Sequence, residues 1–308
     1  MQGDVVSGVL LPLILAFIMF SLGLGLTQGD FRRILVQPRA LLVGVFSHFV
    51  LLPLVCFAML KLLGVSGAFA VGFMILAACP TGATSNLLTY LARGDVALAL
   101  GFTAIASLLT IFTLPIIVTA ALAHFMGTER AVNVPVGLMM GQVALVMGVP
   151  VSLGMVARHR WTAWALRFEP RATRIATGLF VLIVVLAVIK NWPMVQAHFA
   201  ALAPLALVLN LTMLSLGFAV AWLARLSRSQ SITLGIETAV QNAALALVIA
   251  STVLQDGTMA IPGALYGVLM YVGGLLFAWV MRRYVAVPDA AADAARVAGA
   301  PHGVNDPR

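Results

Sequence analysis

One carboxylate in this sequence lies where a charge is costly to hold. Glu237 follows Arg228 by nine residues within an apolar segment, so at ~1.5 Å per helical residue it lies about 14 Å from the basic end. That depth is near the middle of a bilayer, where a carboxylate must be paired or face a wet cavity. The other acidic residues fall in loops, at segment ends or in the tail, and every Lys and Arg lies at or beyond a segment end. We therefore expect its counter-charge to come from solution, as a proton or a metal cation.

Two polar neighbours strengthen this interpretation. Gln241 lies one helical turn beyond Glu237, and Asn242 follows it. The alternative is a permanently protonated Glu237 that only hydrogen-bonds between helices, but three polar side chains within six residues favour a binding site. The chain has no phosphate-binding loop, Ser-His-Asp pattern or di-histidine metal spacing, so we expect no enzyme activity.

A second polar segment runs from Pro80 to Asn86. Pro80 and Gly82 disfavour a continuous helix, and the polar side chains can hydrogen-bond the backbone groups that a break sets free. Counted inward from Arg93, Ser85 and Asn86 lie about 10–12 Å deep. A simple proline kink is the alternative, but it would not need four adjacent polar side chains. The pattern predicts a functional helix break.

Near Glu237 the only residue that disfavours a helix is Gly235. We therefore infer a second helix break there mainly because the Glu237 segment would pair with the Pro80–Asn86 segment. The helix that follows a break presents free N–H groups, which suit an anion, and the preceding helix ends in free carbonyls. These carbonyls, together with Glu237, suit a small hard cation such as sodium. Two such breaks crossing at mid-depth predict cation-coupled transport of an anionic solute.

Three further polar residues lie in apolar segments. His48 is equally consistent with a site residue and with a histidine that hydrogen-bonds a neighbouring helix. Thr103 and Ser107 can face the site or bond their own helix backbone, and backbone bonding is the default expectation for such residues.

The elements that must position these residues are membrane helices. The sequence is 62% hydrophobic and 9% charged, which a soluble domain of 308 residues could not accommodate. Apolar stretches of about 20 residues match the ~30 Å hydrocarbon core. We predict an all-α polytopic membrane protein with about nine transmembrane helices, near residues 5–26, 40–63, 68–92, 96–123, 133–157, 172–190, 203–224, 230–254 and 260–283.

Basic residues predict the orientation. The net charge is +8, but the basic residues lie at the ends of the apolar segments and form no patch interleaved with aromatic residues. We therefore expect no nucleic-acid partner. Arginines gather in alternate connections, which by the positive-inside rule places the N-terminus outside and the C-terminus in the cytoplasm. No basic residue precedes the apolar run at residues 5–26, and no small-residue cleavage site follows a short apolar core, so we expect a retained span. The expected location is a bacterial inner membrane.

The polar segments are the third and eighth, and they cross in opposite directions because their indices differ by an odd number. This predicts an inverted repeat, with a first unit at about 5–123 and a second at about 133–283. Residues 1–285 would form one transmembrane domain, followed by a disordered cytoplasmic tail at 286–308.

The two motifs resemble those of the bile acid:sodium symporter family. Residues 81–98, TGATSNLLTYLARGDVAL, are similar to the family pattern GGTASNVMTYLARGNVALS. Residues 237–242, ETAVQN, resemble EVGMQN, and residues 261–266, IPGALY, resemble VPGALF. Asp30-Phe31 and the stretch from His48 to Pro53 fit as well, so the resemblance extends over about residues 8–283.

The resemblance implies a core domain and a panel domain, two crossed discontinuous helices, and sodium-driven uptake of an organic anion by alternating access. It implies one or two transported sodium ions as the only cofactor, with membrane lipid as surroundings and a functional monomer. One sodium site would use Ser85, Asn86, Thr103 and Glu237. A second would use Glu237, Gln241, the carbonyls of Thr238 and Val240, and His48. The substrate would contact Ala83, Thr84, Asn242 and Tyr271.

Four departures from the family pattern surround this implied site. Ala99 replaces a sodium-ligating Ser, which removes one oxygen from the first site, and His48 stands where some members have Gln, whose amide oxygen is a better sodium ligand than imidazole. Ala83-Thr84 inverts the usual order, and Met270-Tyr271 replaces His-Asn. We therefore prefer a small carboxylate such as pantoate over a bile acid. The alternatives are a proton-coupled organic-anion carrier, in which His48 and Glu237 titrate, and, further from the pattern, a channel.

Overall fold

The computed structural model describes residues 9–30, 32, 38–127 and 135–285, so the predicted tail at 286–308 lies outside the described residues. The described backbone is helical apart from turns and short connections, without a β-strand. Six stretches are long and apolar enough to cross a membrane: Pro38–Leu62, Val96–Met126, Val136–Arg160, Thr162–Lys190, Trp192–Leu223 and Gly257–Arg283.

Four of these stretches are single helices, namely α7 (Val96–Met126), α11 (Thr162–Lys190), α12 (Trp192–Leu223) and α15 (Gly257–Val285). The other two contain a turn of π-helix. They consist of α3 (Pro38–Phe46), η2 (Ser47–Leu51) and α4 (Leu52–Leu62), and of α9 (Val136–Val143), η3 (Ala144–Gly148) and α10 (Val149–Arg160). Pro53 and Pro150 follow the two π-turns, and because proline lacks an N–H, it loosens the preceding hydrogen-bond ladder.

The remaining helices are short. The first is α1 (Leu11–Gly25), and the two polar segments each divide into pieces. The first polar segment gives α5 (Gly67–Ala78) and α6 (Ser85–Leu91), which confirms the predicted break at Pro80–Asn86. The second gives α13 (Arg228–Ala239), α14 (Ala243–Val248) and η4 (Ile249–Val253), with an extended residue, Val240, after α13.

The second break therefore lies beyond Glu237, and Gly235 does not cause it. Gly235 is helical, and a Cβ built there would lie 2.8 Å from the carbonyl oxygen of Leu214. Gly217 of α12 faces it equally closely, since a Cβ there would lie 3.0 Å from the Cα of Gly235. The absent side chains let α12 and α13 approach each other, as small residues do between membrane helices.

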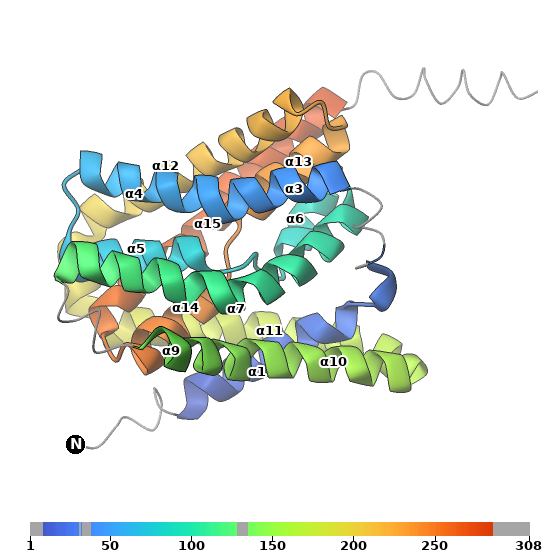
Figure 1. Cartoon of the computed structure of the whole chain (residues 1–308), viewed down its shortest axis with the longest axis horizontal. Coiled ribbons are helices and arrows are strands. Elements are labelled where there is room, and N and C mark those ends of the chain that lie inside the picture. The colour runs from blue at the N-terminus through green and yellow to red at the C-terminus, as the bar shows by residue number, and fades with distance from the viewer. Residues whose placement is uncertain (1–8, 31, 33–37, 128–134, 286–308) are drawn as a thin grey trace, which may run out of the picture.

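The helices form two groups in Figure 1. One layer contains α1, α10 and α11, which pack on one another at the lower side of the view. The other group contains α5, α7, α12, α13 and α15, with the chain breaks near its middle. A cavity between the two groups is lined by α1 and α11 on one side and by residues of the two breaks on the other.

Helix α11 is longer than the predicted segment. Residues 162–171 continue the helix beyond the apolar stretch, so Arg167 and Glu169 lie on a helix rather than in a loop. Hydropathy detects only the apolar part of such a helix, whereas the backbone hydrogen bonds continue as long as polar side chains can reach water.

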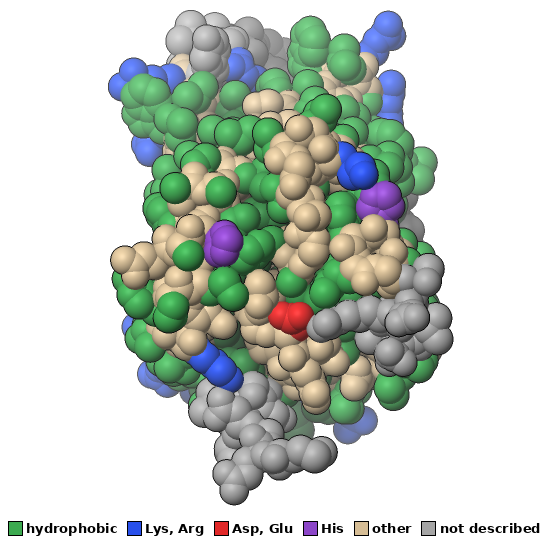
Figure 2. Space-filling view, turned by 90° about the vertical axis from the view of Figure 1, so that its left-hand side faces the viewer, with side chains coloured by type: hydrophobic (Ala, Val, Ile, Leu, Met, Phe, Trp, Pro, Cys, Tyr) green, Lys and Arg blue, Asp and Glu red, His purple; other side chains and the backbone are tan. Residues whose placement is uncertain are grey.

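Basic side chains gather at one end of the molecule. At this end, on the right of Figure 1, α10, α12 and α15 end and α11 and α13 begin. The arginines at or next to these helix ends are Arg158, Arg160, Arg225, Arg228, Arg282 and Arg283, and the first half of α11 adds Arg167, Arg171 and Arg174. Figure 2 shows the opposite end, a mainly hydrophobic surface with few charged side chains. This asymmetry is the one expected of a polytopic membrane protein.

Candidate ion and substrate site

The two helix breaks meet through backbone hydrogen bonds. The N–H of Gly82 donates to the carbonyl of Val240 at 3.0 Å, and the N–H of Asn242 donates to the carbonyl of Pro80 at 2.8 Å. Thr81 and Gln241 pair as an isolated antiparallel bridge. A Cβ on Gly82 would lie 2.9 Å from the carbonyl oxygen of Gln241, so this close crossing requires glycine.

Other side chains satisfy the carbonyls at the end of α13. The amide of Gln241 donates to the carbonyl of Thr238 at 2.8 Å. The carbonyl of Ala239 accepts from the Tyr266 hydroxyl at 2.7 Å and from the Asn210 amide at 3.1 Å. Buried carbonyls need such partners, because there is no water in the hydrocarbon core to replace them.

His48 connects the two broken helices. Its Nδ1 lies 3.0 Å from the carbonyl oxygen of Glu237 on α13, and its Nε2 lies 3.0 Å from the carbonyl oxygen of Cys79 at the end of α5. His48 belongs to η2, and its ring is buried. The Thr81 hydroxyl donates to the same Glu237 carbonyl at 3.3 Å. The predicted site histidine therefore contacts backbone oxygens of both helices.

The Glu237 carboxylate faces α6 and α7. It is fully buried, and its Oε2 accepts a hydrogen bond from Thr103 Oγ1 at 3.0 Å. The hydroxyl of Ser85 also lies beside the carboxylate. Thr103 thus faces the site, whereas Ser107 bonds its own helix at the carbonyl of Thr103, 2.8 Å away.

Three oxygens of the first predicted sodium site lack hydrogen-bond partners. They are Glu237 Oε1, Ser85 Oγ and Asn86 Oδ1, and all three atoms are buried. The Ser85 hydroxyl lies close enough to the carboxylate to interact with it, but it makes no hydrogen bond of good geometry. Buried oxygens without donors cost free energy, and a bound cation would remove that cost. Carboxylate, hydroxyl and amide oxygens suit a hard cation such as sodium, and the described residues contain no cluster of three His, Cys, Asp or Glu side chains that would suit a softer metal.

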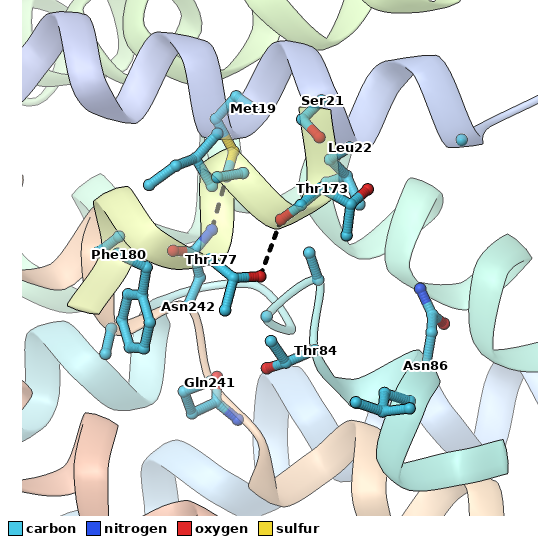
Figure 3. Close-up of a pocket in the computed structure, with 18 of the residues that line it drawn as sticks. Met19, Ser21, Leu22, Thr84, Asn86, Thr173, Thr177, Phe180, Gln241 and Asn242 are labelled. Carbon is cyan, nitrogen blue, oxygen red and sulfur yellow. Dashed lines mark hydrogen bonds between the residues drawn. The ribbon is translucent and has the colours of Figure 1, made fainter. Parts of the chain in front are cut away.

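A cavity of about 300 Å³ borders the breaks. All four predicted substrate residues, Ala83, Thr84, Asn242 and Tyr271, line it. The hydroxyls of Thr84 and Tyr271 lie 2.9 Å apart, and Asn242 Oδ1 caps α14 by accepting from the N–H of Leu245 at 3.0 Å. Figure 3 shows Thr84 and Asn242 on the two breaks, facing a common space with Asn86 and Gln241.

Helix α11 forms the opposite wall of this cavity, and the sequence pattern did not predict any residue of this helix as part of the site. Thr173, Thr177, Phe180 and Glu169 line the cavity from this helix. Thr177 donates to the Thr173 carbonyl at 2.8 Å (Figure 3), and Thr173 donates to Glu169 at 3.2 Å. The spacing of 169, 173 and 177 is a polar stripe with a period of four, which is the signal that could have identified this wall.

This arrangement defines a class of protein: a polytopic helical membrane protein with two interrupted helices that meet at a buried carboxylate beside a cavity. The model of the Sodium Bile acid symporter family matches residues 12–198, and the chain belongs to this family. Its named relatives are cotransporters rather than enzymes.

Individual relatives are moderately similar. The chain is 26% identical over 268 residues to the probable sodium/metabolite cotransporter BASS1, chloroplastic, of Oryza sativa subsp. japonica, covering 87% of this chain and 64% of the relative. It is 29% identical over 254 residues to the human ileal sodium/bile acid cotransporter, covering 82% and 70%. The uncharacterized sodium-dependent transporter YocS of Bacillus subtilis is 33% identical over 108 residues, which is 35% of this chain and 34% of the relative. The chain spans less than two thirds of the length of the chloroplast relatives that it matches.

Proposed function

We propose that this protein is a secondary transporter that couples inward sodium movement to the uptake of an organic anion. The observation that carries the proposal is the buried Glu237 carboxylate, which has an unpartnered oxygen and lies beside the hydroxyls of Ser85 and Thr103. The neighbouring residue of Ser85, Asn86, has a further unpartnered buried oxygen. A charged side chain held in this way at membrane depth needs a cation, and no Lys or Arg lies near it in the sequence. The sodium ion that we propose binds these oxygens and Thr103.

We propose that the anion binds in the adjacent cavity at Ala83, Thr84, Asn242 and Tyr271. These residues offer hydroxyl and amide donors next to the proposed sodium ion, whose charge would favour a carboxylate. The cavity volume of about 300 Å³ lies at the lower limit of typical ligand pockets. This size favours a small carboxylate such as pantoate over a bile acid.

The proposed cycle uses the two helix groups as a panel and a core. The layer of α1, α10 and α11 would be the panel, and it would move against the core that holds both breaks. This proposal includes nine crossings built as an inverted repeat, in a monomer in a bacterial inner membrane, with the N-terminus outside and the C-terminus in the cytoplasm. Its support is the asymmetric distribution of arginine and the position of the cavity between the two groups.

Sodium-dependent stabilisation tests the proposal without knowledge of the substrate. We expect sodium, but not potassium, to raise the midpoint of thermal unfolding of the purified chain, since a ligand at 100 times its Kd stabilises by about 2.7 kcal/mol. Glu237→Gln should abolish this shift while leaving expression near normal. Glu169→Gln removes a carboxylate of the cavity wall on α11 that is not one of the proposed sodium ligands, and it should keep the shift.

Equal stabilisation by both cations would contradict sodium coupling and favour the proton-coupled carrier on the same fold. If sodium alone stabilises the chain, a screen of small carboxylates in vesicles with a sodium gradient would identify the substrate. Uptake that saturates and depends on the gradient would exclude a channel.

A further inference from the structure

The second predicted set of cation ligands differs from the first in its hydrogen bonding. Its backbone oxygens already accept from the protein: the Thr238 carbonyl from the Gln241 amide at 2.8 Å, and the Val240 carbonyl from the Gly82 N–H at 3.0 Å. Because a carbonyl oxygen has two lone pairs, a cation at this position would share each of these oxygens with a protein donor. The first set, by contrast, contains three buried oxygens without partners.

The His48 ring occupies the gap between the two broken helices. Each ring nitrogen lies 3.0 Å from a carbonyl oxygen, one of Glu237 and one of Cys79, so the ring fills the space between these oxygens. The rings of Phe49 and Phe102 contact it edge-on, with centroids 4.8 Å and 5.8 Å away. With 1% of its surface exposed, the ring has little room to turn aside.

Besides Glu237 Oε1, which both sets share, one oxygen of the second set remains without a partner, namely Gln241 Oε1. Hard cations take about six oxygen ligands, and the second set adds one free oxygen to the shared carboxylate where the first set adds two. The first set, with Ser85, Asn86 and Glu237, therefore offers more free oxygens than the second, and this difference points to one bound cation rather than two.

We infer that the chain binds one sodium ion per cycle and that the His48 ring occupies the position of a second. This inference rests on the proposed function, because it assumes that the first set binds sodium. It has a consequence for transport: one sodium ion carried with one monocarboxylate moves no net charge, whereas two sodium ions would move one positive charge.

Equilibrium binding of radioactive sodium to the purified full-length chain in detergent tests the inference. We expect a saturating stoichiometry of one ion per chain. His48→Gln replaces the ring by an amide, whose oxygen can bind sodium, and should raise the stoichiometry to two. His124→Gln is the matched control, because His124 packs against Phe57 and Phe125 away from the breaks, and it should keep one.

The outcomes separate the two claims. Two ions bound to the unmodified chain would overturn the inference and leave sodium coupling intact. No bound sodium would overturn the proposed function itself. A folded His48→Gln variant that still binds one ion would contradict the blocking role of the ring, and if this variant does not fold, the count for the unmodified chain still decides the stoichiometry.

Discussion

At the scale of single residues, a small number of polar groups hold the end of α13 in place. The Ala239 carbonyl is two residues from Glu237, and it is fixed by Tyr266 and Asn210, which are both fully buried. Neither residue contacts the proposed cation. Their positions indicate that they support the site by fixing the backbone from which Glu237 projects.

Tyr266→Phe preserves the ring and removes the hydroxyl, which donates to the Ala239 carbonyl and accepts from the Asn210 amide at 3.3 Å. Because Asn210 still donates to the Ala239 carbonyl, we expect a loss of about 1 kcal/mol in unfolding free energy, together with weaker sodium-dependent stabilisation. The measurement is the midpoint of thermal unfolding with and without sodium. Tyr90→Phe, at a ring that is 70% exposed, should change neither quantity. Unchanged sodium stabilisation in Tyr266→Phe would contradict the supporting role.

Asn242 has two roles that substitutions can separate. Its side-chain oxygen caps α14, its amide nitrogen donates to the sulfur of Met19 on α1 at 3.7 Å, and the residue lines the cavity. Asn242→Ala should cost about 1 kcal/mol because the cap is lost, whereas Asn242→Ser should retain most of the stability because serine also caps helices well. Both should lower uptake of the substrate found by the carboxylate screen. Full uptake by a stable Asn242→Ser variant would contradict the proposed contact with the anion.

Much of the site could be predicted residue by residue, and the reason is depth. Glu237 and Ser85 were identifiable because polar residues far from a span end are rare and costly. Asn210 and the threonines of α11 were missed, since their partners lie on other helices and spacing within one segment does not reveal such contacts. For the same reason the sequence could not decide whether the Thr103 hydroxyl bonds its own helix or faces the site, where it donates to Glu237 on α13.

At the scale of helices, proline and glycine in the sequence predicted one break but not the location of the other. Pro80 and Gly82 lie directly at the first break. The second break, after Ala239, has no helix-breaking residue, and the Gly235 signal belongs to the contact between α12 and α13. Bonds from the first break to Val240 and Asn242 replace the helical ones, so tertiary structure rather than local propensity ends α13.

The contact between α1 and α10 also depends on glycine, and it can be tested. A Cβ on Gly154 would overlap the carbonyl oxygen of Phe20, and one on Gly23 would overlap that of Val151. Gly154→Ala should therefore cost about 1–3 kcal/mol by forcing the helices apart. Gly178→Ala is the matched control: open space surrounds Gly178 on α11, so its stability should be unchanged or slightly higher. Equal unfolding midpoints for the two variants would show that this contact is not tight.

At the scale of the whole molecule, the cavity is asymmetric between the two ends. Its wall on α11 extends from Phe180 to Glu169, toward the end where arginines gather. In the proposed orientation that end would be cytoplasmic, and the cavity would face the inside. A carrier in this state exposes its cavity to one side only, whereas a channel exposes it to both.

Cysteine labelling of single variants in sealed vesicles distinguishes these cases. Cys56 and Cys79 are both buried, so an impermeant maleimide should meet little background. Trp161→Cys, at a residue 64% exposed between α10 and α11, should react only from the cytoplasmic side. Leu62→Cys, 84% exposed at the end of α4, should react only from the outside. The reverse pattern would contradict the proposed orientation.

Thr177→Cys then reports on the cavity itself. Thr177 lines the cavity beside the breaks, so we expect its cysteine to react from the same side as Trp161→Cys and to be protected from the other side. The reason is that the two hydrogen-bonded breaks and the packed core beyond them separate the cavity from the far end. Equal labelling of Thr177→Cys from both sides, in vesicles where the Trp161 and Leu62 variants keep their sidedness, would indicate an open pore and contradict transport by alternating access.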